Sequence, residues 1–189
     1  ISSRGSFRGC GVTLRVLALD TAIATGCAFG VAGGKPHCWT VNLGKASWDT
    51  RFARMLRLVD HAITKFNPDL LAVEGTAAGS YGNPDLIGLA ICARAQASLR
   101  GVRTAIYMPN SVRRHFLGKA LTARDFPGRT KGAAKAAIKG QVIARCVLLG
   151  WDVADDNQAD AAALFDFACS MESRSHQMTT VGGLFAGQK

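Results

Sequence analysis

The sequence predicts an α/β fold, with a mixed sheet of about five strands and helices packed on both of its faces. The first observation is that short runs rich in Val, Leu and Ile alternate with longer stretches whose apolar residues recur every three or four positions. The second is their order: three strands, a helix, a strand, a helix, a strand and then only helices, which is typical of α/β proteins. We expect one domain over residues 13–173, a flexible N-terminal extension over 1–12 and a tail over 174–189.

Five strands are expected, over residues 13–20, 25–34, 35–44, 69–75 and 102–108. The second and third flank a Gly-Gly-Lys turn, which predicts a hairpin. The first strand, "TLRVLALD", and the fourth, "DLLAVEG", are almost continuously apolar, as strands buried on both faces are. Each of these two strands ends in a carboxylate, Asp20 and Glu74 respectively.

Helices are expected over residues 47–66, about 84–100, 109–118, about 131–149 and from about 156 onward. Ser47 offers an N-cap to the first helix, and Asn67 and Pro68 end it. The second helix follows the glycine-rich loop "GTAAGSYGNP", and the third opens with a proline. The fourth helix ends at Gly150, a residue suited to a helix C-terminus.

The chain is basic, because 23 Lys and Arg residues outweigh 13 Asp and Glu residues and give a formal net charge of +10. This imbalance favours a polyanionic partner, nucleic acid before a membrane, since no apolar run reaches the roughly 18 residues of a bilayer span. A merely basic soluble protein is the alternative. The six cysteines are scattered without a C-x-x-C pair, which predicts a reduced intracellular protein without structural zinc.

Carboxylates at the ends of apolar elements predict a metal site. If the strands that end in Asp20 and Glu74 are parallel neighbours, their side chains lie together at the edge where α/β sheets bind ligands. Asp160, one turn beyond Asp156 on the last helix, heads an apolar stripe and is expensive to bury without a cation. Mg²⁺ prefers oxygen ligands and would relieve the repulsion, and two such ions can clamp a phosphodiester displacement.

Each acid also has an ordinary structural interpretation. Asp20 could turn the chain, Glu74 could be a strand-end acid beside a glycine, and Asp160 could pair with an arginine. Asp155 and Asp156 could cap the last helix. The joint placement favours a site, because three of these acids end apolar elements that must pack together.

A basic surface is predicted downstream of the fifth strand. Lys131, Lys135 and Lys139 recur at i, i+4 and i+8 on one side of a helix, where they could contact phosphates or simply form a solvated face. The other basic candidates precede them, namely Arg113, Arg114, Lys119, Arg124 and Arg129. Tyr81, Phe116 and Phe126 are candidates for base stacking, although Phe116 also suits the core.

Three stretches in order, "LALDTAIATGCAFG", "LLAVEG" and "DDNQADAAALFDFA", resemble motifs of the RuvC family of Holliday junction resolvases, in the RNase H-like superfamily. The likeness extends from about residue 14 to 172, and the last motif is most similar to phage-encoded members. It implies an RNase H-like fold and a homodimer that nicks four-way DNA junctions symmetrically, with Mg²⁺ as cofactor, two ions and Mn²⁺ as a substitute. It also implies the cytoplasm of a bacterial or phage-infected cell, with organellar targeting left open.

The resemblance assigns catalytic and metal-binding roles residue by residue. Asp20 matches the aspartate of the first strand, Glu74 the glutamate of the fourth and Asp160 the last aspartate. The fourth family ligand, an acid or histidine three residues earlier, falls on Asn157, so Asp156 is our preferred replacement. The aromatic residue that probes the junction in bacterial members has no clear counterpart, because Tyr81 is the only aromatic residue in that loop.

Three other functions remain open at this stage. Asn157 allows a member of the fold that binds nucleic acid without cutting it, and an RNA-processing nuclease is the nearest competitor. The stretch "DTAIATG" also resembles the first phosphate loop of ATP-binding actin-like proteins and kinases, but those proteins are usually much longer.

Overall fold

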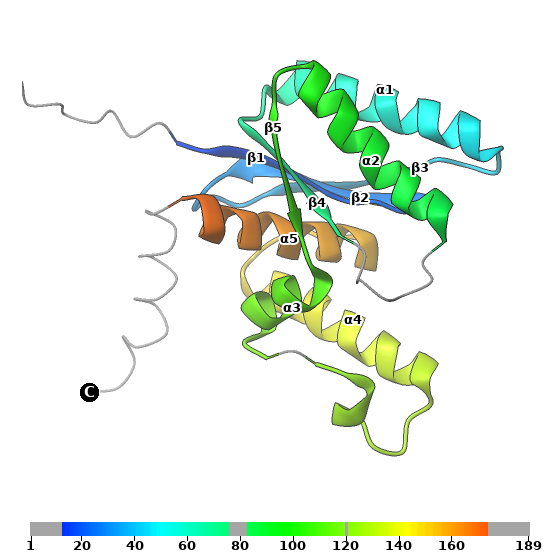
Figure 1. Cartoon of the computed structure of the whole chain (residues 1–189). Helices are drawn as coiled ribbons and strands as arrows, with labels where there is room; N and C mark the ends of the chain where they lie inside the picture. Colours follow the sequence, from blue (N-terminus) through cyan, green and yellow to red (C-terminus); the bar gives the residue numbers. More distant parts are fainter. Residues whose placement is uncertain (1–12, 76–82, 120, 174–189) are drawn as a thin grey trace, which may run out of the picture.

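The computed structural model describes residues 13–75, 83–119 and 121–173. One mixed sheet carries the strands in the order β3-β2-β1-β4-β5 (Figure 1). The strands are β1 (Arg15–Asp20), β2 (Ala24–Val31), β3 (His37–Asn42), β4 (Leu70–Glu74) and β5 (Arg103–Tyr107). β2 is antiparallel to both β1 and β3, so these three strands form a meander, whereas β4 is parallel to both β1 and β5. The predicted α/β class, the five strands and the hairpin are confirmed.

Helices cover both faces of the sheet, as predicted (Figure 1). One face carries α1 and α2, and the other carries α5, outside which α3 and α4 pack. The α-helices are α1 (Trp48–Phe66), α2 (Pro84–Leu99), α3 (Pro109–Leu117), α4 (Lys131–Leu148) and α5 (Asp156–Glu172), with a short 3-10 turn at Ala123–Asp125. None of the helices in the described ranges is long and apolar enough to cross a bilayer.

The local signals at the helix ends act as the sequence predicts. Ser47 accepts a hydrogen bond from the backbone of Thr50, and Asn67 ends α1 in the left-handed region at φ 46°. Gly150, just past α4, has φ +70°, which a residue with a side chain adopts only with strain. Asp155, not Asp156, is the N-cap of α5. All the strands and helices begin and end within about three residues of the expected bounds.

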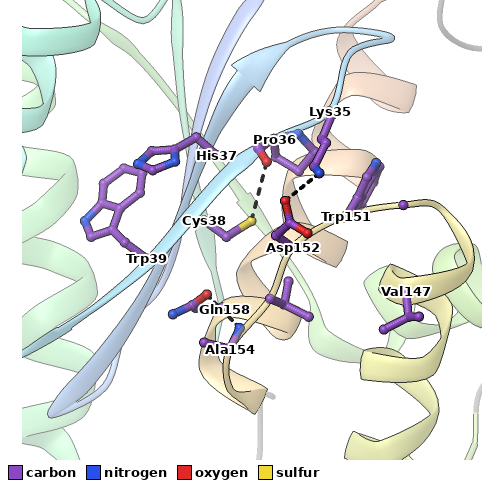
Figure 2. A pocket seen from close by; sticks show the side chains of 12 residues that line it. Lys35, Pro36, His37, Cys38, Trp39, Val147, Trp151, Asp152, Ala154 and Gln158 are labelled. Carbon is purple, nitrogen blue, oxygen red and sulfur yellow. Dashed lines mark hydrogen bonds and ion pairs between the residues drawn. The ribbon is translucent and has the colours of Figure 1, made fainter.

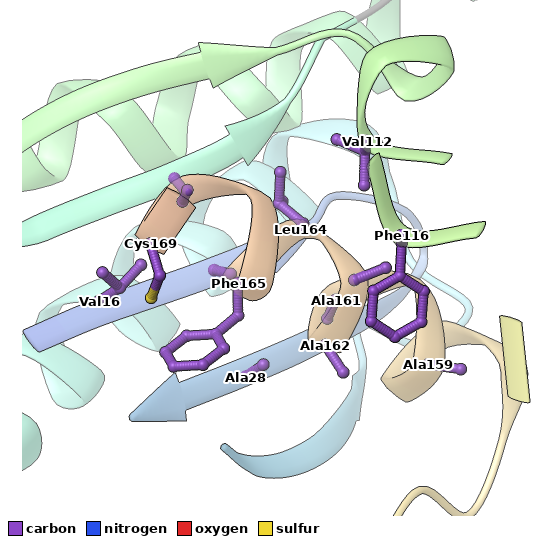
Figure 3. Close-up of a cluster of buried hydrophobic side chains, with 14 of the residues drawn as sticks. Val16, Ala28, Val112, Phe116, Ala159, Ala161, Ala162, Leu164, Phe165 and Cys169 are labelled. Carbon is purple, nitrogen blue, oxygen red and sulfur yellow. The ribbon is translucent and has the colours of Figure 1, made fainter. Parts of the chain in front are cut away.

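The helix α5 lies close to the sheet because its buried face is built from small residues (Figure 3). Phe165 is the largest fully buried side chain in the described ranges and packs over β2, where Gly30 leaves room for its ring. The fully or almost fully buried alanines of this helix are Ala159, Ala161, Ala162, Ala163 and Ala168. A helix with short side chains approaches a sheet closely, so α5 can bring Asp160 to the edge of β1.

Candidate active site

Asp20 and Glu74 are neighbours at the carboxyl ends of β1 and β4. The two strands are parallel, and Leu19 is in register with Val73, so the next residue on each strand is one of the two acids. Hydrogen bonding with the Asp20 side chain is one of the causes that raise the pKa of Glu74, as it can be when one of the two carboxyl groups is protonated. The predicted juxtaposition of these two strands is therefore confirmed, and it rests on the apolar residues that bury β1 and β4 on both faces.

The environment of Glu74 and Asp160 favours the protonated forms of these two carboxyl groups. Burial, followed by the charge of Asp20 and the hydrogen bond to it, raises the pKa of Glu74 far above its usual range. Burial and the charge of Asp20 also raise the pKa of Asp160, to about 6. Three carboxyl groups therefore act on one another electrostatically, and a cation placed among them would favour their ionised forms.

The first turn of α5 is held against the sheet by close backbone contact. Gly26 of β2, which pairs with Asp20 across the sheet, lies against the main chain of Asn157 so closely that a Cβ would overlap it. Thr40 of β3 donates a 2.7 Å hydrogen bond to Asp155, whose other oxygen accepts from the backbone of Gln158 at 2.8 Å. These contacts fix the distance of the first turn of α5 from the sheet, and therefore the position of the acids that this helix carries.

Arg113 and Lys139 are the cations that act on Asp160. Both charges lower the pKa of Asp160, but burial and the charge of Asp20 raise it by more. Arg113 also lowers the pKa of Glu74. We predicted Arg113 only as part of the basic surface. It is in fact half-buried on α3, and its charge acts on Glu74 and Asp160. A sequence signal for this role existed. β5 ends at the same edge of the sheet as Glu74, and Arg113 follows shortly after it, four residues beyond Pro109 at the start of α3.

Asp156 differs from the other acids of the site. Its carboxylate forms an ion pair with Lys139, and this hydrogen bond lowers the pKa of Asp156. Lys139 belongs to the predicted basic stripe, so the structure gives one member of that stripe an acidic partner from another helix. Asn157, the residue at the family's fourth ligand position, contributes backbone contacts to Gly26.

The remaining basic candidates lie at the protein surface. Arg114, Lys119, Arg124, Arg129, Lys131 and Lys135 are exposed. Arg129 lies over the ring of Phe126, with its guanidinium carbon 5.9 Å from the ring centroid. Phe116 is buried in the core against Trp151, which excludes it from base stacking. Tyr81 lies outside the described residues.

The donor set suits a hard divalent cation, although its present arrangement is incomplete. Carboxylate oxygens are the ligands that Mg²⁺ prefers, and Asp20 and Glu74 offer them side by side. Within residues 13–75, 83–119 and 121–173, no three Asp, Glu, His or Cys side chains are grouped closely enough to hold one ion. A shared ion would therefore require Asp160 to turn toward the pair.

A cleft of about 890 Å³ lies elsewhere, at the edge strand β3 (Figure 2). It runs between β3 and the segment that leads from α4 to α5, where Lys35 and Asp152 form an ion pair of 2.6 Å and Trp151 lies beside them. None of the four acidic candidates lines it. The cleft therefore gives no support to the carboxylate site.

The fold is shared with structurally characterised junction resolvases. The sequence matches no protein-family model and no curated protein. RuvC of Thermus thermophilus superposes with a TM-score of 0.62 at 19% identity, covering 88% of this chain and 98% of that chain. The T. thermophilus RuvC in complex with a Holliday junction substrate gives 0.59 at 20% identity, over 85% and 97%. The fowlpox virus resolvase in complex with substrate Holliday junction DNA gives 0.52 at 12% identity, over 85% and 100%. The chain thus has the RNase H-like fold of the RuvC-type Holliday junction resolvases.

Proposed function

We propose that this protein is a divalent-metal-dependent endonuclease that nicks four-way DNA junctions. The observation that carries the proposal is the pair of carboxyl groups of Asp20 and Glu74 at the carboxyl ends of two parallel strands, where the charge of Asp160 also acts on Glu74. Stable proteins rarely collect partly buried acids without a cation to compensate them. The shared fold adds the class of substrate, since two of the similar structures are complexes with Holliday junctions.

Asp20, Glu74 and Asp160 are the residues that would hold Mg²⁺, or Mn²⁺ in its place. When bound, two such ions would activate the attacking water and neutralise charge on the phosphate and the leaving oxygen. The protein's own contribution is to fix the carboxylates on rigid elements, two strand ends and the first turns of α5. None of the three acids needs to act as the general base.

The cations around the acids would bind the scissile phosphate. Arg113 and Lys139 act electrostatically on Asp160 and both are partly buried, so they can approach a phosphate at the metal site. The exposed lysines of α4 and the arginines before it extend this charge over a wider surface. Contacts of this kind position a duplex without reading its sequence, which suits recognition of junction shape.

A homodimer would place two such sites on one junction, as symmetric nicking requires. The exposed apolar residues Ile91 of α2 and Ile106 of β5 line one groove, and Leu99 of α2 is 80% exposed. An unpartnered apolar strip of this kind favours a protein contact over continuous exposure to solvent. Mass measurement by light scattering tests the dimer directly.

Cleavage of a labelled four-way junction tests the proposed function. We expect paired nicks by the wild type in Mg²⁺ and none in EDTA, and no nicks by Asp20→Asn under either condition. A linear duplex of the same sequence and a structured RNA serve as controls for substrate class. Nicking that Asp20→Asn retains in full would contradict the assignment of the site.

Asn157 and the incomplete ligand group favour one second candidate, a junction-binding protein that does not cut. An amide at the fourth position brings no charge to neutralise a second ion. In that case the wild type would bind the four-way junction in Mg²⁺ without producing nicks. Preferred cutting of the structured RNA would instead favour an RNA-processing nuclease.

A further inference from the structure

We propose that Asp156 is a positioning residue that holds the ammonium group of Lys139 beside Asp160, and that it is not the fourth metal ligand. The inference rests on the proposed nuclease function, because it assigns a role within that site. It also revises our expectation from the sequence, in which Asp156 replaced the missing ligand and Lys139 either contacted a phosphate or belonged to a solvated helix face.

The ion pair joins α4 to the first turn of α5. Asp156 is the first residue of α5, and Lys139 lies in the middle of α4. The two side chains pair directly, and they keep only 37% and 30% of their side-chain exposure. Asp156 and Asp160 are four residues apart on α5 and so share one face of that helix, and the charges of Asp160 and Asp20 act on the ammonium of Lys139.

The carboxylate of Asp156 is arranged to bind a cationic side chain and not a metal ion. Its Oδ2 atom pairs directly with the ammonium of Lys139, and more than a third of the side chain remains exposed. A metal ion bound to this carboxylate would be repelled by the neighbouring positive charge of Lys139. At the first position of α5 the acid is further stabilised by the helix dipole, without a metal.

Holding Lys139 in place has a clear use in phosphate binding. A free lysine side chain samples many rotamers, and fixing it costs conformational entropy that a prior contact removes. An ammonium group has three N–H donors, so Lys139 can keep its bond to Asp156 and still donate to a phosphate oxygen. Asp156 would thus hold the Lys139 side chain in position for phosphate binding before the substrate binds.

The experiment combines a metal-binding measurement with a double-mutant cycle. The variants are Asp156→Asn, Asp156→Glu, Lys139→Ala and the double variant Asp156→Asn/Lys139→Ala. The matched control is Asp152→Asn, which breaks the 2.6 Å ion pair with Lys35 at the edge strand β3. Thermal melting of each variant shows that it folds.

Three results are expected. The affinity for Mn²⁺, measured by electron paramagnetic resonance without DNA, stays within about twofold in Asp156→Asn, because the proposal gives Asp156 no bond to the ion or to any of its ligands. Single-turnover cleavage falls about tenfold in Asp156→Asn and is largely restored in Asp156→Glu. In the Lys139→Ala background, Asp156→Asn has no further effect on cleavage, and Asp152→Asn leaves cleavage unchanged.

A tenfold loss of Mn²⁺ affinity in Asp156→Asn would overturn the inference, because it would make Asp156 a ligand. Additive losses in the double variant would also overturn it, since the two residues would then act independently. If the wild type binds junctions but cuts none, the proposed nuclease function fails. In that case the affinity for the four-way junction is measured for the same variants of the double-mutant cycle. Coupling between Asp156 and Lys139 in these affinities supports the positioning role, and independent effects contradict it.

Discussion

Gly26 of β2 lies directly against the main chain of Asn157, and this contact seats the first turn of α5 on the sheet. A methyl group at residue 26 would overlap backbone atoms, which cannot rotate away as a flexible side chain can. Since Gly26 pairs with Asp20, the contact joins the helix that carries Asp160 to the strand that carries Asp20. The relative position of Asp20 and Asp160, which are far apart in the chain, thus depends on the absence of a side chain at residue 26.

Gly26→Ala should therefore destabilise the protein by about 1–3 kcal/mol, the usual effect of overpacking, and displace Asp160 enough to abolish cleavage. Urea denaturation measures the first effect and the junction assay the second. Gly132→Ala on α4 is the matched control, because nothing lies within 4 Å of a Cβ there. We expect it to be neutral or to stabilise the helix by up to about 1 kcal/mol. Equal behaviour of the two variants would contradict the contact.

Glu74→Gln should stabilise the metal-free protein at pH 8 while it abolishes cleavage. The pKa of Glu74 is raised in the folded state, so the folded protein holds a proton that the unfolded chain releases above about pH 4.3. The unfolding free energy of the wild type should then fall as the pH rises from about 5 toward the raised pKa. Thermal melts across this range should show a weaker decline in Glu74→Gln, and Mg²⁺ should restore stability only in the wild type.

Arg113→Ala should move the pH dependence of cleavage to higher pH. The charge of Arg113 lowers the pKa of Glu74 and of Asp160, so its removal raises both and a higher pH is needed to ionise the ligands. The pH profile of single-turnover cleavage measures the shift. Arg114→Ala provides the comparison, because Arg114 is exposed on the same helix, and its profile should keep the position of the wild type.

Lys135→Ala should weaken junction binding at low salt and reduce the salt dependence of binding by about one phosphate contact. Lys135 is exposed on α4, one turn before Lys139. Binding isotherms in Ca²⁺ at several salt concentrations give the slope. Lys65→Ala, at the end of α1, should leave that slope unaltered, because α1 covers the opposite face of the sheet.

The sequence was sufficient to predict the fold because apolar periodicity and cap residues reflect interactions between residues only a few positions apart in the chain. The pairing of Asp20 with Glu74 could also be predicted, since two continuously apolar strands must lie inside the sheet and their ends then meet. The ion pair of Asp156 with Lys139 could not, because it depends on how α4 crosses α5. The position of Arg113 beside the acids likewise depends on where β5 and α3 lie, and periodicity in α3 alone does not reveal it.

The alanines on the inner face of α5 have a consequence for how the site can vary. Their short side chains set the distance between α5 and the sheet, so that distance is determined by residues without chemical function. Replacing one of them with valine or leucine would lift the helix and separate Asp160 from Asp20 with every ligand still present. Comparisons that consider only the acids would miss this kind of inactivation, whereas the volume of the residues beneath the helix would reveal it.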